Sequence, residues 1–211
     1  MRWPLPSAAC VVALALIAGL SLPPRVATAF PKPATAPVSW ELNFTHSKPK
    51  RITVGGDAYW YMTYGVVNNT DEERHFLPSF ELVTENGDVL RSDRRIPFNV
   101  FQAIKTREKN RFLEHYTAVG GPLRLGEDEA KEGVAIWKEP NPEMGRFSIF
   151  VTGLSGEHVI MKDADGKDRK DAEGRPLILR KTLQLNYLIR GDEVYPGEDE
   201  VNVNAEEWVM R

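Results

Sequence analysis

Cysteine is nearly absent from this chain of 211 residues, in which Cys10 is the only one. Cys10 precedes most of an apolar run near the start of the chain, so it is not placed like the lipidated cysteine of a cleavage site. A single cysteine forms no intrachain disulfide, and a chain that loses it by processing has no thiol nucleophile and no thiolate metal ligand. The fold is therefore expected to depend on its hydrophobic core.

Concentrated positive charge is missing too. The chain has 27 basic and 30 acidic residues, a net charge of −3, and neither a basic block nor a basic helix face. The sequence therefore predicts no nucleic-acid partner. It also has no phosphate-binding loop and no dinucleotide fingerprint, and none of its 4 histidines lies close enough to another for a local zinc pair. No cofactor is predicted.

The first 29 residues have the composition of a secretory signal peptide. Arg2 is followed by the apolar run Ala8–Leu20 and then by Ala27-Thr28-Ala29, which predicts cleavage after Ala29. The alternative is a membrane anchor, but the run is short for a span and Pro23-Pro24 follow it directly. We therefore expect no transmembrane anchor after cleavage, and a periplasmic or extracellular location.

The segment Tyr59–Asn69 is the longest run of aromatic and β-branched residues, and an Asn-Asn-Thr-Asp turn ends it. Both of its faces are largely apolar, which predicts a central strand with cover on both sides. The tail Val201–Arg211 is expected to pack only loosely. Further strands are predicted where apolar residues alternate, at Val38–Phe44, Ile52–Val54, His75–Thr84, Val89–Arg91, Val134–Trp137, Arg146–Thr152, His158–Lys162 and Pro176–Arg190.

One region, Arg94–Tyr116, breaks the alternation. Pro97 is suited to open a helix, and Phe98, Phe101 and Ile104 recur at helical spacing, so a helix is predicted near Pro97–Glu108. The sequence thus predicts a Pro-rich lead-in over residues 30–37 and a single all-β domain over residues 38–211, with a helical insertion near residues 94–116.

Several segments occur in the order found in a known group of domains. They are G-V-V-N-N-T-D (Gly65–Asp71), F-E-L-V-T-E-N-G (Phe80–Gly87), L-G-E-x-x-x-x-E-G-V-A-I-W-x-x-P (Leu125–Pro140) and F-S-I-F-V (Phe147–Val151). This order resembles the telokin-like, immunoglobulin-like domains of secreted and lipid-anchored bacterial proteins. The later segment R-K-T-L-Q-L-N-Y (Arg180–Tyr187) is similar to uncharacterised secreted proteins of planctomycete-type bacteria. The resemblance implies an immunoglobulin-like β-sandwich and brings no catalytic residues with it.

Asp163, Asp165 and Asp168 surround Gly166 and are the candidate metal ligands, because calcium is bound by several oxygens from a tight turn. The spacing is not that of an EF-hand, since Gly174 stands where the last glutamate would be. Four basic residues share the loop, so the alternative is a solvated hairpin loop.

Tyrosines and tryptophans could form a stacking platform for a sugar or peptide, or they could fill the core. Tyr61 is the aromatic residue that we expect to be exposed, and it is the candidate ligand-binding residue.

The sequence predicts an exported, non-catalytic module with a binding or envelope-structural role and an unknown protein or glycan partner in the cell envelope. The alternatives are a carbohydrate- or peptide-binding domain that uses exposed aromatics, and a hydrolase with a non-local carboxylate pair.

Overall fold

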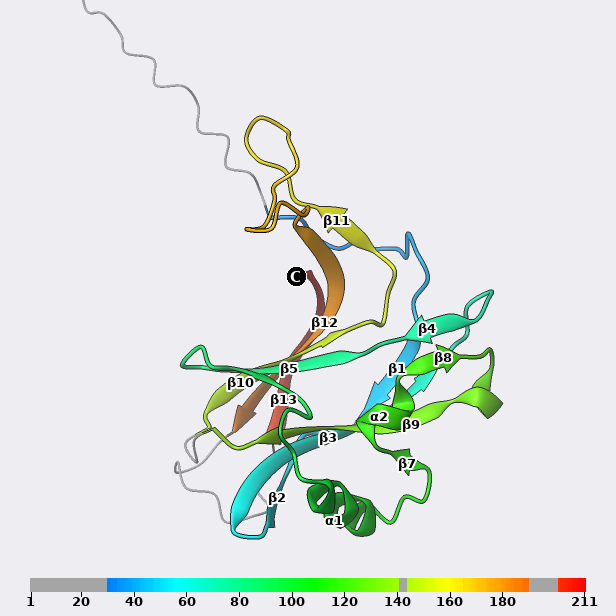
Figure 1. Ribbon diagram of the computed structural model, residues 1–211, viewed down its shortest axis with the longest axis vertical. Helices are drawn as coiled ribbons and strands as arrows, with labels where there is room; N and C mark the ends of the chain where they lie inside the picture. Colours follow the sequence, from blue (N-terminus) through cyan, green and yellow to red (C-terminus); the bar gives the residue numbers. More distant parts are fainter. Residues whose placement is uncertain (1–29, 141–143, 190–200) are drawn as a thin grey trace, which may run out of the picture.

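The computed structural model describes residues 30–140, 144–189 and 201–211 (Figure 1). The predicted signal peptide, with Cys10, lies outside the described residues. Strands dominate the chain, and the all-β prediction is confirmed. The elements are β1 (Asn43–His46), β2 (Lys50–Val54), β3 (Asp57–Val67), β4 (Arg74–Phe76), β5 (Ser79–Thr84), β6 (Val89–Arg91), α1 (Phe98–Glu108), β7 (Leu113–Glu114), α2 (Tyr116–Val119), β8 (Gly121–Leu123), a 3₁₀ turn (Glu127–Glu129), β9 (Lys131–Lys138), β10 (Arg146–Thr152), β11 (His158–Ile160), β12 (Ile178–Ile189) and β13 (Val201–Met210).

The strands form two main sheets. The first has the order β1-β3-β9-β7, and β2 also pairs with β3. The second has the order β11-β12-β10-β5-β6, and β13 also pairs with β12. Neighbouring strands are antiparallel except β7 and β9, while β4 and β8 form a small separate ladder. A tight turn at Asn86-Gly87 joins β5 to β6 as a hairpin, and Gly87 has the positive φ of 87° that such a turn requires.

Strand β3 is the centre of the first sheet, and both of its faces are covered. Trp60, Met62 and Tyr64 point into a core that the two main sheets share. Tyr59 and Tyr61 point the other way, into a second core beneath α1. Figure 1 shows α1 against one side of β3, with β5 and β10 on the other side. The two apolar faces of the sequence therefore correspond to two different packing partners.

The predicted helix is present as α1. Pro97 precedes its first residue with an extended backbone, and Lys109 ends it in the left-handed conformation, at φ 52°. The side chains that face the sheet are Val100, Phe101 and Ile104, all of them buried. This face seals the outer side of the first sheet, so the insertion adds a helical layer to the β structure.

The tail is a correction to the sequence prediction. Val201–Met210 is not loosely packed but forms β13, which pairs with β12 from Lys181 to Ile189. Its pattern is hard to recognise because Glu206 and Glu207 are exposed on an edge strand, where charges discourage pairing with other chains. Val201 and Met210 at its ends are buried in the structure.

Several other strand predictions differ from the structure in extent, and two of them show why. His75–Thr84 is divided into β4 and β5, because Pro78 has no N–H with which to continue a ladder. Val38–Phe44 contributes only its last two residues to β1, and Val38 is exposed rather than buried.

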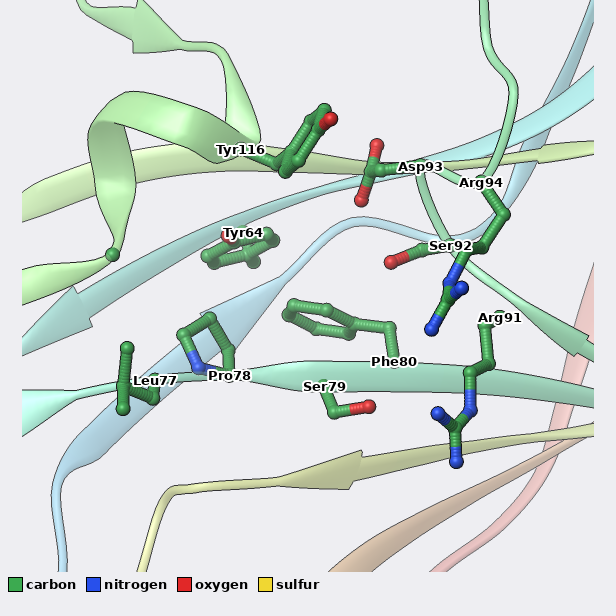
Figure 2. A pocket seen from close by; sticks show the side chains of 11 residues that line it. Tyr64, Leu77, Pro78, Ser79, Phe80, Arg91, Ser92, Asp93, Arg94 and Tyr116 are labelled. Carbon is green, nitrogen blue, oxygen red and sulfur yellow. The ribbon is translucent and has the colours of Figure 1, made fainter.

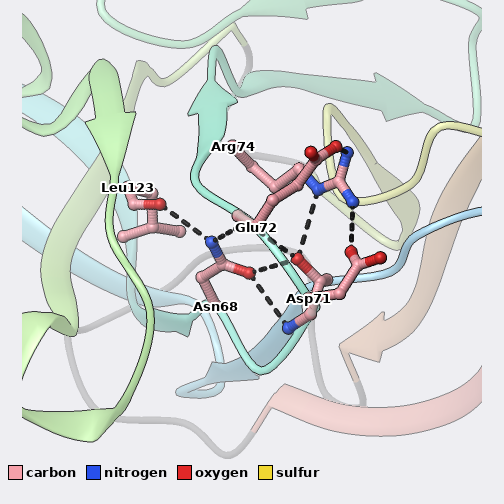
Figure 3. A network of polar contacts seen from close by, with 6 residues as sticks. Asn68, Asp71, Glu72, Arg74 and Leu123 are labelled. Atoms are coloured by element: carbon pink, nitrogen blue, oxygen red, sulfur yellow. Dashed lines mark hydrogen bonds and ion pairs between the residues drawn. The ribbon is translucent and has the colours of Figure 1, made fainter.

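The Asn-Asn-Thr-Asp turn after β3 is organised by one buried side chain, that of Asn68 (Figure 3). Its amide nitrogen donates to the carbonyl oxygens of Glu72, at 2.9 Å, and Leu123, at 2.8 Å. Its amide oxygen accepts from the backbone N–H and the hydroxyl of Thr70. This residue therefore joins the end of β3 to β8 and fixes the turn between β3 and β4.

Asn68→Ala is expected to lower the free energy of unfolding by about 2 kcal/mol, because it removes the side-chain donor of the buried Leu123 carbonyl oxygen and the bonds that close the turn. Urea denaturation measures the loss. Asn69→Ala, at the exposed neighbouring position, is the matched control and should change stability by much less. Equal losses in the two variants would contradict the role given to Asn68.

Candidate functional site

The segment after β6 crosses from one main sheet to the other. The Ser92 N–H donates to the carbonyl oxygen of Phe80 in the second sheet, at 2.9 Å. The next N–H, that of Asp93, donates to the carbonyl oxygen of Ile136 in the first sheet, at 2.8 Å. Two consecutive backbone groups thus hold the sheets at a fixed separation on this side of the molecule.

Beside this crossing lies a cavity of about 370 Å³, which we call the Asp93 groove (Figure 2). Its walls come from Leu77–Phe80, Arg91–Arg94, Tyr64, Tyr116 and Gly120. These segments belong to the connection between β4 and β5, the end of β6, strand β3 and helix α2. The groove therefore exists only because four distant parts of the chain meet here.

Aromatic rings form the floor of the groove and part of its rim. Tyr64 from the first sheet and Phe80 from the second are both buried, with ring centroids 4.6 Å apart. Leu77, 65% exposed, and Tyr116, 44% exposed, stand at the rim. Burial, together with the nearby Asp93 and Glu114 carboxylates, raises the pKa of Tyr64, so its hydroxyl stays neutral. A concave apolar surface with a few polar groups is the usual form of a small-molecule site.

The floor depends on one glycine of strand β9. Gly133 lies opposite Tyr64 in the β3–β9 register. A Cβ atom at Gly133 would come within 2.5 Å of the Tyr64 ring, so only glycine leaves room for the ring in its present position.

Asp93 is the one acidic residue among the described residues that line the groove. Removal of its carboxyl from water raises the pKa of Asp93 to about 7, although hydrogen bonds from the Ser92 side chain and the Ile136 backbone act in the opposite direction. In the described part of the chain no cation lies within ion-pair distance of this carboxylate, and the nearby Arg91 pairs with Glu81 at 3.1 Å. A raised acid pKa in a cleft is a marker of functional sites.

The backbone around Asp93 is also unusual. Asp93 has φ 61° and Arg95 has φ 57°, both in the left-handed region. Non-glycine residues adopt this conformation at a cost of about 1–3 kcal/mol each, and such residues gather at functional sites. Aspartate tolerates it better than most residues do, which suits position 93.

An aromatic cluster extends from the rim of the groove to the start of α1. The ring of His115 lies 4.3 Å from Tyr116, 5.1 Å from Phe101 and 5.5 Å from Phe98, measured between centroids. Burial lowers the pKa of His115, which favours its neutral form. These contacts fix the position of α2, and through it the position of the Tyr116 ring at the groove.

Tyr61 is not exposed, and that expectation of the sequence analysis was wrong. The ring is fully buried between β3 and α1, and its hydroxyl donates to Glu108 Oε1 at 2.6 Å. Burial and the hydrogen bond to Glu108 raise the pKa of Tyr61. The sequence predicted the helix but not the face of β3 that it covers. Tyr116 is the exposed aromatic residue at the groove instead.

The candidate calcium ligands do not converge. Asp163 Oδ1 accepts from the backbone N–H groups of Asp165 and Lys167, at 2.9 Å each, and Asp168 lies 4.0 Å from Lys162 Nζ. In the described ranges no group of three acidic or histidine side chains is arranged to hold a metal ion. The carboxylate of Asp163 is used to close its own turn, as the solvated-hairpin alternative requires.

This loop, which projects beyond β11 in Figure 1, contains the same turn twice. D-A-D-G-K begins at Asp163 and D-A-E-G-R begins at Asp171. In the second turn Asp171 Oδ1 accepts from the N–H groups of Glu173, at 3.0 Å, and Arg175, at 2.9 Å. We call the two turns together the arm.

A buried ion cluster lies away from the groove. Lys181 precedes the core residues Leu183, Leu185 and Tyr187 on the same face of β12 and is only 3% exposed. Its Nζ forms ion pairs with Glu41 and, at 3.3 Å, with Glu157 Oε2, and it lies 5.1 Å from the Trp208 ring centroid. Glu157 Oε1 also accepts from the backbone N–H of Ala34, at 2.8 Å, and so ties the lead-in to the domain.

No protein-family model matches the chain, and neither the curated proteins nor the solved structures contain a significant match. Among the helices that the structure describes, none has the length and apolarity to cross a membrane.

Sequence reasoning did not identify the groove. Asp93 stands in a run of polar residues, R-S-D-R-R, that looks like an ordinary loop. The one local signal is that this run follows a hairpin and precedes a helix, where a chain must change layers.

Proposed function

We propose that this protein is an exported, non-catalytic binding module whose ligand occupies the Asp93 groove. Export is supported by the signal-peptide pattern before Phe30 and places the module in the periplasm or outside the cell. Its ligand is a component of the cell envelope. The observation that carries the proposal is the groove itself, with its buried aromatic floor, its exposed rim and one carboxyl group of raised pKa.

The fold of this module is an immunoglobulin-like β-sandwich with a helical insertion. Two mostly antiparallel sheets that share one core support this, as does the resemblance to telokin-like domains. The helical layer of α1 and the arm after β11 are additions to such a sandwich.

Binding is favoured over hydrolysis by the groups that line the groove. Glycoside hydrolysis uses two carboxyl groups about 5–10 Å apart, and Asp93 is a single acid among the described lining residues. The other polar lining groups are the hydroxyls of Ser79 and Ser92 and two arginines. Such groups orient a ligand by hydrogen bonds and stacking.

Tyr116→Ala is expected to weaken binding in the groove by about tenfold, because the ring supplies an exposed stacking surface at the rim. Envelope constituents are screened by thermal shift, since a ligand that binds the folded state raises the midpoint. Phe112→Ala is the matched control: this ring is 62% exposed but does not line the groove. A ligand that binds equally well to both variants, or that is chemically altered by the protein, would contradict the proposal.

A saccharide-binding role is the second candidate. The exposed ring of Tyr116 beside the carboxyl of Asp93 and the hydroxyl of Ser92 offers one stacking face and several hydrogen-bonding groups. Glycan-array binding that is lost in Tyr116→Ala would establish it.

N-terminal sequencing of the mature protein tests export independently, with Phe30 as the expected first residue.

A further inference from the structure

We infer that the Asp93 groove selects a small zwitterion, with an alkylammonium group held among the aromatic rings and Asp93, and an anionic group held by Arg94. The inference rests on the proposed function of the same groove and names the chemical class of its ligand. It follows from the separation of aromatic, acidic and basic groups within a single cavity.

Figure 2 shows this separation. The rings of Tyr64, Phe80 and Tyr116 lie toward one end of the groove, and the guanidinium groups of Arg91 and Arg94 lie toward the other. Asp93 projects between the two ends.

The aromatic end suits an ammonium group. Aromatic faces attract a cation placed within about 6 Å of the ring centroid, and sets of such rings recognise alkylated ammonium ligands. When it is ionised, the carboxyl group of Asp93 adds a negative charge. It is drawn out of water without an ion-pair partner in the described part of the chain, and an unpaired buried charge is unfavourable. A bound ammonium would neutralise it.

The other end suits an anion. Arg94 is exposed, so its guanidinium donors are available to a carboxylate or a phosphate group. Arg91 is already paired through its Nε with Glu81, at 3.1 Å, and adds positive charge at the same end. A ligand with only a cation would meet these arginines, and a ligand with only an anion would meet Asp93. A zwitterion avoids both repulsions.

The size of the cavity agrees with a small ligand. Its volume of about 370 Å³ is near the lower limit for ligand pockets, roughly 300–1,000 Å³. A neutral sugar would also fit and would stack on the rings, but it would leave the charges of Asp93 and Arg94 without partners. Neutral saccharide binding is therefore the competing outcome of the test.

The test is isothermal titration of the mature protein with phosphocholine at pH 8, where Asp93 is ionised. Choline alone and inorganic phosphate alone are the two half-ligand arms. We expect phosphocholine to bind at least about tenfold more tightly than either half, since each half leaves one charged group unmatched. Vesicles of phosphatidylcholine form the third arm. Binding to free phosphocholine and to vesicles assigns a lipid headgroup, and binding to the free compound alone assigns a soluble zwitterion.

Asp93→Asn and Arg94→Ala should each weaken phosphocholine binding at least about tenfold, because each removes the partner of one charge. Arg124→Ala, a similarly exposed arginine outside the groove, is the matched control and should bind normally. Circular dichroism and thermal midpoints show whether the variants are folded.

Choline or phosphate binding as tightly as phosphocholine would overturn the inference, and so would unchanged binding by Asp93→Asn. If phosphocholine does not bind, but a neutral glycan does and its binding depends on Tyr116, the inference is overturned. The proposed binding function would then still stand. If none of these compounds binds in the groove, both the inference and the proposed binding function are overturned.

Discussion

Asp93→Asn is expected to raise the free energy of unfolding at pH 8 by about 2–4 kcal/mol. Burial raises the pKa of Asp93 to about 7 in the folded protein, whereas an aspartate in an unfolded chain titrates near pH 4. The folded state therefore keeps its proton to higher pH than the unfolded state does. The contribution of Asp93 to the free energy of unfolding is therefore highest below pH 4 and falls between pH 4 and pH 7. Above pH 7 this contribution no longer changes with pH.

Asparagine has the same shape, tolerates the left-handed backbone at this position and carries no charge at any pH. The difference between the two proteins should therefore be small near pH 4 and should grow by about 1.4 kcal/mol per pH unit between pH 4 and pH 7. Urea denaturation at four or five pH values measures it. Asp88→Asn, on the exposed β5–β6 turn, controls for the loss of one negative charge. A constant difference at every pH would show that Asp93 is not the group responsible.

The prediction has a functional side. A group that destabilises the protein when ionised fits a binding site, because stability and activity are recurrently traded against each other at such sites. Asp93→Asn should therefore produce a more stable protein with weaker ligand binding. A stable variant with full binding would separate the two properties and contradict the groove proposal.

Lys181→Ala is expected to lower the free energy of unfolding by about 3 kcal/mol, because it leaves the partly buried carboxylates of Glu41 and Glu157 without their shared cation. The loss is large because Lys181 is nearly inaccessible, whereas exposed ion pairs contribute only about 0–1 kcal/mol. Truncation also removes the alkyl chain of the lysine from its packing.

Lys181→Met separates charge from packing. It retains an apolar chain of similar length, so it should remain nearly as destabilised if unpaired carboxylates are the cause. Adding Glu41→Gln and Glu157→Gln to Lys181→Met should then recover much of the loss. Lys167→Ala in the exposed arm is the control. A Lys181→Met variant of full stability would mean that the ion cluster contributes little.

The sequence correctly predicted the elements whose secondary structure follows from the spacing of their own apolar residues. The alternation of Arg146–Thr152 corresponds to β10 residue for residue, and the helix predicted near Pro97–Glu108 differs from α1 by one residue. In each case the apolar spacing alone distinguishes strand from helix.

The same reasoning failed for features that depend on which other element packs against a strand. Tyr61 and Met62 both lie on apolar faces of β3, and the pattern does not reveal that one faces a helix and the other a sheet. β13 was missed because an edge strand carries exposed glutamates on one part and apolar residues on another. The Asp93 groove was missed because Tyr64, Phe80 and Tyr116 meet only after both sheets have formed.

The doubled turn of the arm makes its length adjustable. Asp163 and Asp171 begin equivalent turns, and each closes its own turn through its carboxylate, with a glycine at positive φ in each. Neither turn draws a side chain from the two cores, so adding or removing one turn would change how far the arm reaches without repacking the interior. The chain thus carries a natural position at which whole turns can be gained or lost, and at which a foreign peptide could be displayed.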